Sequence, residues 1–379
     1  MTKRTPELRF KGFVDDWEQR KLGDVTESFD GKRIPIDSGL RVSGEYPYYG
    51  ATGIIDYVDD YIFDGEYVLL AEDGANIIMR NYPVAYLTQG KFWLNNHAHI
   101  MRMKDGSNYF LVQMLEKIDY MKYNTGTAQP KLNSKIVKNI EFKLPHIEEQ
   151  QKIGTFFKQL DDTIALHQRK LDLLKQLKQG YLQKMFPATG ESIPKVRFAD
   201  FDEDWEQREL GKVVEITMGQ SPNSANYTDN PDDHILVQGN ADMKDGRVFP
   251  RVWTTQVTKQ AEKGELIMSV RAPVGDIGKT EYDVVLGRGV AAIKGNEFIF
   301  QSLGRMKEIG YWNRLSTGST FESINSNDIK EAMIQVPSED EQERIGVFFG
   351  QLDNLITLHQ NKLKSLKEIK KSFLNRMFV

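Results

Sequence analysis

The chain has 379 residues, of which 40% are hydrophobic and 27% charged, an ordinary composition for a globular protein with two or three domains. It has no cysteine, which excludes disulfides and thiolate metal sites, and its formal net charge of −4 gives no overall basic character that would indicate nucleic acid. No apolar run approaches the roughly 18 residues of a spanning helix, and none follows the N-terminal charges. We therefore expect a cytoplasmic protein without a membrane-spanning helix or a secretory signal.

The first part of the chain predicts a mixed α/β domain. Runs of β-branched, aromatic and aliphatic residues at 67–70, 84–87 and 99–103 predict short strands between glycine, asparagine and aspartate residues. Residues 109–123 carry apolar side chains at helical spacing and predict a helix.

A long helix is predicted after Pro145, because apolar residues then recur at alternating steps of four and three. The series lasts for more than four heptads, which is typical of a coiled-coil seam. A helix of roughly 40 residues is about 60 Å long, too long for one small domain to bury. The seam consists of Ile153, Phe157, Leu160, Ile164, His167, Leu171, Leu174, Lys178, Tyr181 and Met185.

The rest of the chain repeats this plan. The segment from Pro6 to Gly23 returns at 194–211, and the segment from Pro145 to Phe186 returns at 337–378, whereas the stretches between them barely resemble each other. A constant frame with two different inserts indicates one scaffold that carries two different recognition surfaces. The second insert is again predicted to be mixed α/β, with strands at 235–237, 266–270 and 290–293 and a helix at 298–310.

This repeat divides the chain into six predicted segments. They are a lead-in at 1–23, a variable domain at 24–144, a long helix with its linker at 145–190, a second lead-in at 191–211, a second variable domain at 212–336 and a second long helix at 337–379.

The obvious partner of each long helix is the other one, and antiparallel packing is predicted because it gives a closed pseudo-two-fold repeat. The fold class is then α+β: two mixed α/β domains separated by two long, antiparallel coiled-coil helices. In this packing Leu160 should lie near Leu366 rather than Leu352, and His167 near His359. The predicted helix-pair interface consists of Leu160, Ile164, His167, Leu171, Leu174, Leu352, Ile356, His359, Leu363 and Leu366.

Two further kinds of side chain recur with the frame. Trp17 and Trp205 belong to the matching lead-ins, which favours a role as packing anchors over base stacking. Lys178 and Lys370 occupy the helix seam, from which each can reach solvent or a carboxylate on a partner subunit.

The sequence has none of the common catalytic motifs. A phosphate-binding Gly-x-x-x-x-Gly-Lys-[Ser/Thr] loop, a Gly-x-Gly-x-x-Gly turn entering a helix, an Asn/Asp-Pro-Pro-aromatic element and a His-Glu-x-x-His pair are all missing. Asp232 and Asp233 are two acids in a polar stretch, a weak signal for a metal site. We therefore predict no catalytic residue, no metal and no cofactor in this chain.

The frame resembles the specificity subunit of type I restriction–modification systems. Both lead-ins contain Arg-Phe followed by Trp-Glu-x-Arg-x-Leu-Gly, at 9–23 and 197–211. Both long helices open with Pro-x-x-x-Glu-Gln-x-x-Ile, and a Thr-Gly element precedes each, at Thr125 and Thr317. Any one of these motifs is weak, but their order, duplication and spacing cover the chain twice.

This resemblance implies that the two variable domains are target-recognition domains, each reading one half of a split double-stranded DNA sequence. The paired helices would set the gap between the halves. The frame would dock two methyltransferase subunits, and translocase–nuclease subunits would join the full complex. S-adenosylmethionine, ATP and magnesium would belong to those partner subunits.

DNA reading is expected from lysine, arginine, amide and hydroxyl side chains on loops, because phosphate contacts supply affinity and base-edge contacts supply sequence. The stretch Asn95–His97 is either another reading loop or a turn. The predicted DNA-binding residues are Lys32, Arg33, Thr125, Thr127, Gln129, Lys131, Gln220, Ser221, Asn223, Arg271, Thr317, Ser319 and Thr320.

The sequence therefore predicts a non-catalytic, sequence-specific DNA-binding subunit. The alternative is a structural adaptor with two protein-binding heads on a coiled-coil strut, which the acidic net charge favours.

Overall fold

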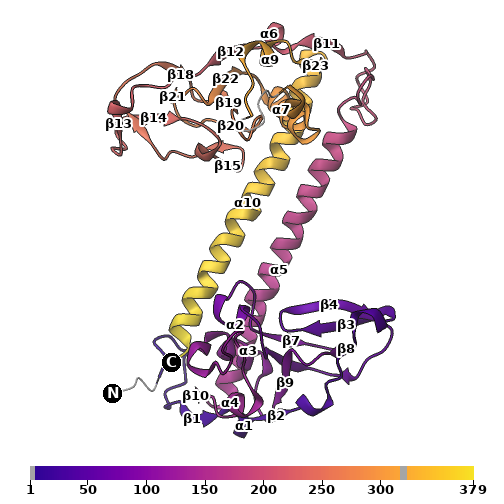
Figure 1. The fold of residues 1–379 in the computed structure, drawn as a ribbon, viewed down its shortest axis with the longest axis vertical. Coiled ribbons are helices and arrows are strands. Elements are labelled where there is room, and N and C mark those ends of the chain that lie inside the picture. Colours follow the sequence, from indigo (N-terminus) through magenta and orange to yellow (C-terminus); the bar gives the residue numbers. More distant parts are fainter. Residues whose placement is uncertain (1–4, 316–321) are drawn as a thin grey trace. The chain divides into compact units, whose positions relative to one another are not determined.

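The computed structural model describes residues 5–315 and 322–379, and the chain forms two compact units. Unit 1 combines Met1–Arg169 with Asn361–Val379, and unit 2 is Lys170–Gln360. Figure 1 labels many of the helices and strands of both units. The two long helices are α5 (Ile147–Lys184) and α10 (Glu339–Met377), so the division between the units falls inside each of them.

Unit 1 contains two four-stranded sheets and short helices. The strand orders are β2-β9-β6-β7 and β4-β3-β8-β5. The strands are β2 (Thr26–Ser28), β3 (Ser43–Gly50), β4 (Gly53–Val58), β5 (Phe63–Asp64), β6 (Tyr67–Ala71), β7 (Ala85–Thr88), β8 (Lys91–Leu94) and β9 (Ala98–Met103). The helices are α2 (Asn76–Met79), α3 (Asn108–Lys117) and the 3₁₀ turns η1 (Asp30–Lys32), η2 (Ser38–Leu40) and η3 (Tyr120–Tyr123).

Strand β6 shows why these strands read as uninterrupted apolar runs. Its side chains alternate between two cores: Val68 and Leu70 pack with α3, and Tyr67 and Leu69 pack against the other sheet. The strand is buried on both faces, so no position is left for a polar side chain.

The three strands predicted for the first insert are confirmed as β6, β7 and β9, but the predicted helix at 109–123 is divided. Helix α3 ends at Lys117, where Ile118 is extended, and the Asp119 carboxylate then accepts a hydrogen bond from the amide of Met121. This local cap starts the separate turn η3, although the apolar spacing continues across it.

Unit 2 follows the same plan with a six-stranded sheet, β12-β22-β19-β20-β16-β15, and a five-stranded sheet, β13-β17-β14-β21-β18. The strands are β12 (Glu215–Met218), β13 (Tyr227–Thr228), β14 (His234–Val237), β15 (Met243–Lys244), β16 (Arg247–Val248), β17 (Trp253–Thr254), β18 (Lys259–Ala261), β19 (Leu266–Ser269), β20 (Ile277–Lys279), β21 (Val284–Leu286) and β22 (Val290–Lys294). The helices are α7 (Glu297–Glu308), α8 (Tyr311–Leu315) and the turns η4 (Ser224–Asn226) and η5 (Asn240–Asp242). The predicted strands are confirmed as β14, β19 and β22, and the predicted helix as α7.

The frame is the part that both units share. In unit 1, β1 (Glu18–Lys21) pairs antiparallel with β10 (Glu141–Leu144), and α1 (Leu22–Val25) lies against α4 (Ser134–Lys138). The backbones approach so closely that a Cβ on Gly23 would lie 3.0 Å from the Lys138 Cβ. Unit 2 repeats the arrangement with β11 (Glu206–Glu209), β23 (Met333–Val336), α6 (Leu210–Val213) and α9 (Ser326–Lys330).

A buried ion pair explains the matching sequence motifs of the lead-ins and helix starts. Arg9 donates from Nε and Nη2 to the two carboxylate oxygens of Glu149 at 2.9 and 2.7 Å, and Trp17 Nε1 donates to the same carboxylate at 3.2 Å. The hydrogen bonds and charge of Glu149 raise the pKa of the Arg9 guanidinium, although burial opposes them. The fork geometry of arginine suits this bidentate contact, which ties the lead-in to the first turn of α5.

Unit 2 repeats this tie between Arg197 and Glu341, with two hydrogen bonds of 2.8 Å. Trp205, unlike Trp17, has no hydrogen bond at Nε1 within the described part of the chain. Both tryptophans are buried in the cores of their units, so the packing role predicted for them is confirmed.

Within each unit, the parts of α5 and α10 run antiparallel. In unit 1, Phe156 contacts Phe373, and Lys370 donates to Asp161 at 2.8 Å. As the residue number rises along α5, the residue number of its partner in α10 falls. The predicted antiparallel direction is therefore confirmed. The end of α10 also completes the unit 1 core, because Met377 and Phe378 pack with Trp17 and Phe110.

In unit 2 the two helices are again antiparallel, but here the end of α5 packs against the start of α10. Lys178 donates to Asp353 at 2.7 Å, Tyr181 contacts Phe348, and Phe186 packs with Trp205. Lys178 and Lys370 therefore bind carboxylates of this chain, which corrects the expectation that they reach solvent or a partner subunit.

A donor from the short helix of each insert completes both lysine–aspartate pairs. Tyr109 on α3 donates to Asp161 at 2.7 Å, and Gln301 on α7 donates to Asp353 at 2.8 Å. Each aspartate thus joins three elements of its unit. Burial, and then the neighbouring Asp161, raise the pKa of Tyr109, which keeps its hydroxyl protonated as a donor.

These contacts also bear on the register of the helix pair. The predicted pairing of Leu160 with Leu366 would place residue 365 opposite Asp161, whereas Asp161 binds Lys370, five residues further along. The contacts therefore favour a register about one turn from the predicted one. The apposition of His167 and His359 stays a prediction.

The predicted interface residues differ in burial. Leu363 and Leu366 in unit 1 and Leu171 and Leu352 in unit 2 are buried. The others are half-buried: Leu160, Ile164, His167, Leu174, Ile356 and His359.

Candidate nucleic-acid interface

Four loops of unit 1 meet beyond the end of β6. They are residues 29–34, 72–74, 95–97 and 124–131, here called the unit 1 loop cluster. Backbone hydrogen bonds join them: Glu72 N donates to His97 O at 2.8 Å, and Gly74 N donates to Pro130 O at 3.0 Å. The loop at 29–34 is joined through Arg33, whose Nη1 donates to Ala98 O at 2.8 Å. Segments separated by as many as 100 residues thus form one surface, and Asn95–His97 belongs to it.

Glu72 is the charged centre of this cluster. Its carboxylate lies 2.7 Å from Arg33 Nη1 and 3.5 Å from Lys131 Nζ. The cluster therefore contains both loops with predicted basic residues, but Arg33 and Lys131 differ in their surroundings. Arg33 is 13% exposed and engaged with Glu72 and backbone carbonyls, so it holds the loops together, whereas half of the Lys131 side chain is exposed.

The other predicted DNA-binding residues of unit 1 lie on the outside of the cluster. Lys32 is exposed, with its ammonium 5.4 Å from the centre of the Phe29 ring. The exposed residues Thr125, Thr127 and Gln129 lie on the Thr-Gly loop, which Asn124 shapes by accepting hydrogen bonds from two backbone amides.

A buried Asp–His pair supports the cluster from below. The His99 Nδ1 lies 2.7 Å from an Asp30 carboxylate oxygen, and its Nε2 lies 2.7 Å from Leu132 O, so both ring nitrogens face acceptors. Burial alone would raise the pKa of Asp30. The hydrogen bond and charge of His99, the Ile100 amide and Arg33 outweigh burial, and the pKa lies below its usual value.

This lowered pKa predicts an acid-sensitive contribution to the stability of unit 1. A carboxylate with a depressed folded-state pKa stabilises the fold above its unfolded pKa of about 3.9, and this stabilisation is lost as the pH falls through the folded value. Asp30→Asn should therefore lower the free energy of unfolding at pH 7 by about 1–3 kcal/mol. Urea unfolding should show the gap to the wild type closing below about pH 4. A gap that is the same at pH 7 and pH 3.5 would contradict this role of Asp30.

Unit 2 brings together the corresponding loops, here called the unit 2 loop cluster. They are residues 219–223, 270–273, 287–289 and the described residues 322–324. Val270 N donates to Gly289 O at 2.9 Å, and Ala272 N donates to Glu322 O at 3.0 Å. The Ser221 hydroxyl accepts from Arg288 N at 3.1 Å.

The predicted residues of unit 2 that the structure describes all lie in this cluster. Gln220, Asn223 and Arg271 are exposed, and Ser221 is half-buried against the 287–289 loop. The remaining three predicted residues, Thr317, Ser319 and Thr320, lie outside the described residues.

The two loop clusters correspond position by position. The amide of Glu72 bonds to the carbonyl of His97 in unit 1, as the amide of Val270 bonds to that of Gly289 in unit 2. Isolated antiparallel bridges join Asp73 to Lys131 and Arg271 to Ser323. By this alignment, Asp73 in unit 1 corresponds to Arg271 in unit 2, Asn96 to Arg288, and Lys131 to Ser323. The frames thus hold the same loops, which carry different side chains.

Sequence reasoning missed Arg288. Its signal was present, because Gly287-Arg288-Gly289 interrupts two apolar strand runs. The glycines are needed for close packing: a Cβ on Gly289 would lie 2.0 Å from Gln238 O. The exposed Arg288 side chain thus projects from a tightly packed turn.

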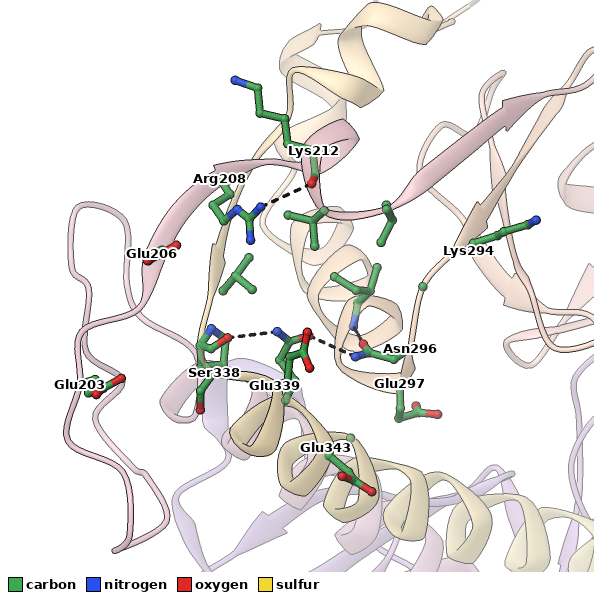
Figure 2. A pocket seen from close by; sticks show the side chains of 18 of the residues that line it. Glu203, Glu206, Arg208, Lys212, Lys294, Asn296, Glu297, Ser338, Glu339 and Glu343 are labelled. Atoms are coloured by element: carbon green, nitrogen blue, oxygen red, sulfur yellow. Dashed lines mark hydrogen bonds between the residues drawn. The ribbon is translucent and has the colours of Figure 1, made fainter.

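A separate pocket of about 900 Å³ in unit 2 is lined by frame residues and by the start of α10 (Figure 2). It lies near Lys294, at the opposite end of β22 from the Arg288 turn. Its charges are mixed, with Arg208, Lys212 and several glutamates around it. No group of His, Cys, Asp or Glu suited to a metal ion occurs among the described residues, and the pocket is not part of the loop cluster.

Comparisons with known proteins place this geometry in a family. The model for the type I restriction modification DNA specificity domain matches the chain twice, at residues 14–176 and 202–368. A putative type I restriction enzyme specificity subunit of Haemophilus influenzae is 27% identical, over 89% of this chain and 88% of its own length. A similar putative subunit of Methanocaldococcus jannaschii is 29% identical, over 70% of this chain and 65% of its own.

Solved structures show the same fold. A type I restriction–modification S subunit from M. genitalium has a TM-score of 0.76 at 16% identity and covers 99% of both chains. A chain from a study of assembly and conformational transition in a type I system has a TM-score of 0.52 at 22% identity, over 96% of this chain and 97% of its own.

None of the helices in the described residues is long and apolar enough to cross a membrane.

Proposed function

Because the chain belongs to the type I restriction–modification DNA specificity family, we propose that it selects a bipartite DNA target on which methyltransferase subunits act. It is a specificity subunit without catalysis of its own. Each loop cluster reads one half of the target, and the chemistry is done by the partners. The observation that carries this proposal is the correspondence of the two clusters: equivalent loops hold different side chains, as two different half-sites require.

The contacts of each cluster with DNA follow from its side chains. In unit 1 we assign them to Lys32, Lys131 and the hydroxyl and amide groups of the Thr-Gly loop, with Arg33 holding the loops in place. In unit 2 we assign them to Gln220, Ser221, Asn223 and Arg271, together with the Thr-Gly residues Thr317, Ser319 and Thr320. Phosphate contacts by lysine supply salt-dependent affinity, and base-edge contacts supply sequence. The overall negative charge suggests that partner subunits contribute to affinity.

We assign the docking of two methyltransferase subunits to the frame, because its outer surface is repeated. In unit 1 a groove of about 450 Å³ is lined by Phe10, Lys152 and Phe156 among others. In unit 2 a groove of about 810 Å³ is lined by residues at matching positions, among them Phe198, Arg344 and Phe348. In both, the cation also lies over a ring of the lead-in: Lys152 over Phe13 at 4.8 Å, and Arg344 over Phe201 at 5.2 Å. Two copies of one surface suit two copies of one partner.

The cofactors and the location follow from this division of labour. S-adenosylmethionine belongs to the methyltransferase subunits, and ATP and magnesium belong to translocase–nuclease subunits. We propose a cytoplasmic location, where the protein meets cellular DNA.

The proposal is tested by sequencing the methylated bases of a host that carries the methyltransferase partner, with and without this chain. We expect one split, non-palindromic motif that is methylated only when the chain is present, because the two reading surfaces differ. Binding of random duplexes by the purified complex should select the same motif. No selected motif in either experiment would leave the structural adaptor as the better function.

A further inference from the structure

The loop cluster of unit 2 contains two exposed arginines, Arg271 and Arg288. Within the described residues, neither Arg271 nor Arg288 makes an ion pair with a carboxylate, and both side chains are exposed. Most other arginines of this unit are engaged. Arg197 binds Glu341, Arg247 binds Glu281, Arg251 binds Asp242 and Arg344 binds Asp200.

The backbone at both arginines is fixed, although the side chains are exposed. The carbonyl of Arg271 accepts a hydrogen bond from the Ser269 hydroxyl at 2.8 Å, and Arg271 forms the bridge with Ser323. The amide of Arg288 donates to Ser221, and Gly289 packs against the backbone of Gln238. The two turns are joined by the hydrogen bond from Val270 N to Gly289 O. A fixed backbone lowers the entropy cost of presenting a long side chain to a ligand.

The corresponding positions of unit 1 have different chemistry. Asp73 stands in place of Arg271, and its carboxylate binds His97 at 2.9 Å. Asn96 stands in place of Arg288. The same two backbone positions thus carry guanidinium groups in unit 2 and a carboxylate and an amide in unit 1. Phosphates are alike at every sequence, so phosphate contacts would not require such a difference.

We propose that Arg271 and Arg288 are specificity-determining residues of unit 2, each reading a guanine in the half-site that this unit recognises. The guanidinium group donates two parallel hydrogen bonds to O6 and N7 of guanine in the major groove, a pattern that no other base pair offers. The inference rests on the proposed DNA-reading function and adds the base that the two side chains select. Unit 1 has Asp73 and Asn96 at the corresponding positions, so no arginine reads a guanine from there.

Lysine variants separate base reading from phosphate binding, because lysine keeps the charge and loses the planar fork. In the complex with the methyltransferase, Arg271→Lys and Arg288→Lys should each lower the preference for guanine at one position of the second half-site by about 5- to 150-fold. The first half-site should not change. Arg247→Lys is the matched control, because Arg247 already pairs with Glu281. Arg247 lies next to Lys279 of β20, which pairs with the start of β19, whereas Arg271 follows the end of β19.

The readouts are methylated-base sequencing in the host and selection of duplexes by the purified complex. Loss of one guanine in each variant, with the control unchanged, is the expected result. Retention of the full wild-type motif in both lysine variants would overturn the proposal, and so would an equal loss of binding at all sequences. A wild-type complex that selects no motif would instead refute the proposed function itself, so the two failures are distinguishable. Thermal unfolding of the variants within about 2 °C of the wild type would show that these exposed substitutions leave the fold intact.

Discussion

A chain in which residues 212–336 are replaced by a copy of residues 24–144 should direct methylation to a target that contains the first half-site twice. The two frames hold their inserts by the same contacts, namely the β1–β10 and β11–β23 pairings and the Arg9–Glu149 and Arg197–Glu341 ion pairs. The copied segment therefore brings its own loop cluster together with β10, which takes the place of β23 in the pairing with β11. The present second half-site should disappear completely, since none of its reading residues remains.

Methylated-base sequencing checks this result, and exchange of the insert for that of another family member is the matched control. In the control, one half-site should change and the other should persist. A change in both halves in either chain would show that the two units do not read independently.

Replacing Glu149 by alanine should lower the free energy of unfolding of unit 1 by about 3–5 kcal/mol, because breaking a buried pair leaves an uncompensated charge. The carboxylate is 1% exposed and accepts hydrogen bonds from Arg9 and Trp17, so both donors would lose their partner. Equilibrium urea unfolding, followed by the fluorescence of the five tryptophans, of which Trp17 and Trp93 lie in unit 1, measures the effect.

Glu27→Ala is the control for this prediction. Glu27 binds Arg102 at 2.8 Å on the surface of the same unit, where both side chains are about half exposed. Exposed pairs contribute only about 0–1 kcal/mol, so this variant should be close to the wild type. Equal stabilities of the two variants would mean that the buried pair does not tie the lead-in to α5.

The local elements of this protein were predictable from its sequence because their patterns are local. The heptad seams predicted α5 and α10, and the repeated lead-ins predicted the frame. Strands such as β6 and β19 were visible as apolar runs because they are buried on both faces. Among the elements that were predicted, the exception was α3, which ends at Lys117 because a single capping interaction outweighs continued apolar spacing. The short strands β3, β4, β5 and β8 of the second sheet of unit 1 were not predicted.

The predicted reading residues that the structure describes were also brought together, but their contacts depend on neighbours far away in the chain. Arg33 joins the first cluster through Glu72, which lies 2.7 Å from it, and Arg288 joins the second cluster through Ser221. Hydrogen bonds between segments separated by dozens of residues leave no periodic trace in a sequence.

By itself, the sequence determined the duplication, the constant frame, the two long helices and the two variable inserts, since repetition and hydrophobic periodicity record them directly. Only the tertiary structure decided which core each helix end completes and in which register the two helices pack. The end of α10 completes the core of unit 1. Asp161 binds Lys370, whereas the predicted pairing of Leu160 with Leu366 would place residue 365 opposite it. The heptad pattern shows which face of a helix is apolar but is nearly the same after a shift of one turn. The choice among such registers falls to specific charged and aromatic pairs, which meet only when the chain is folded.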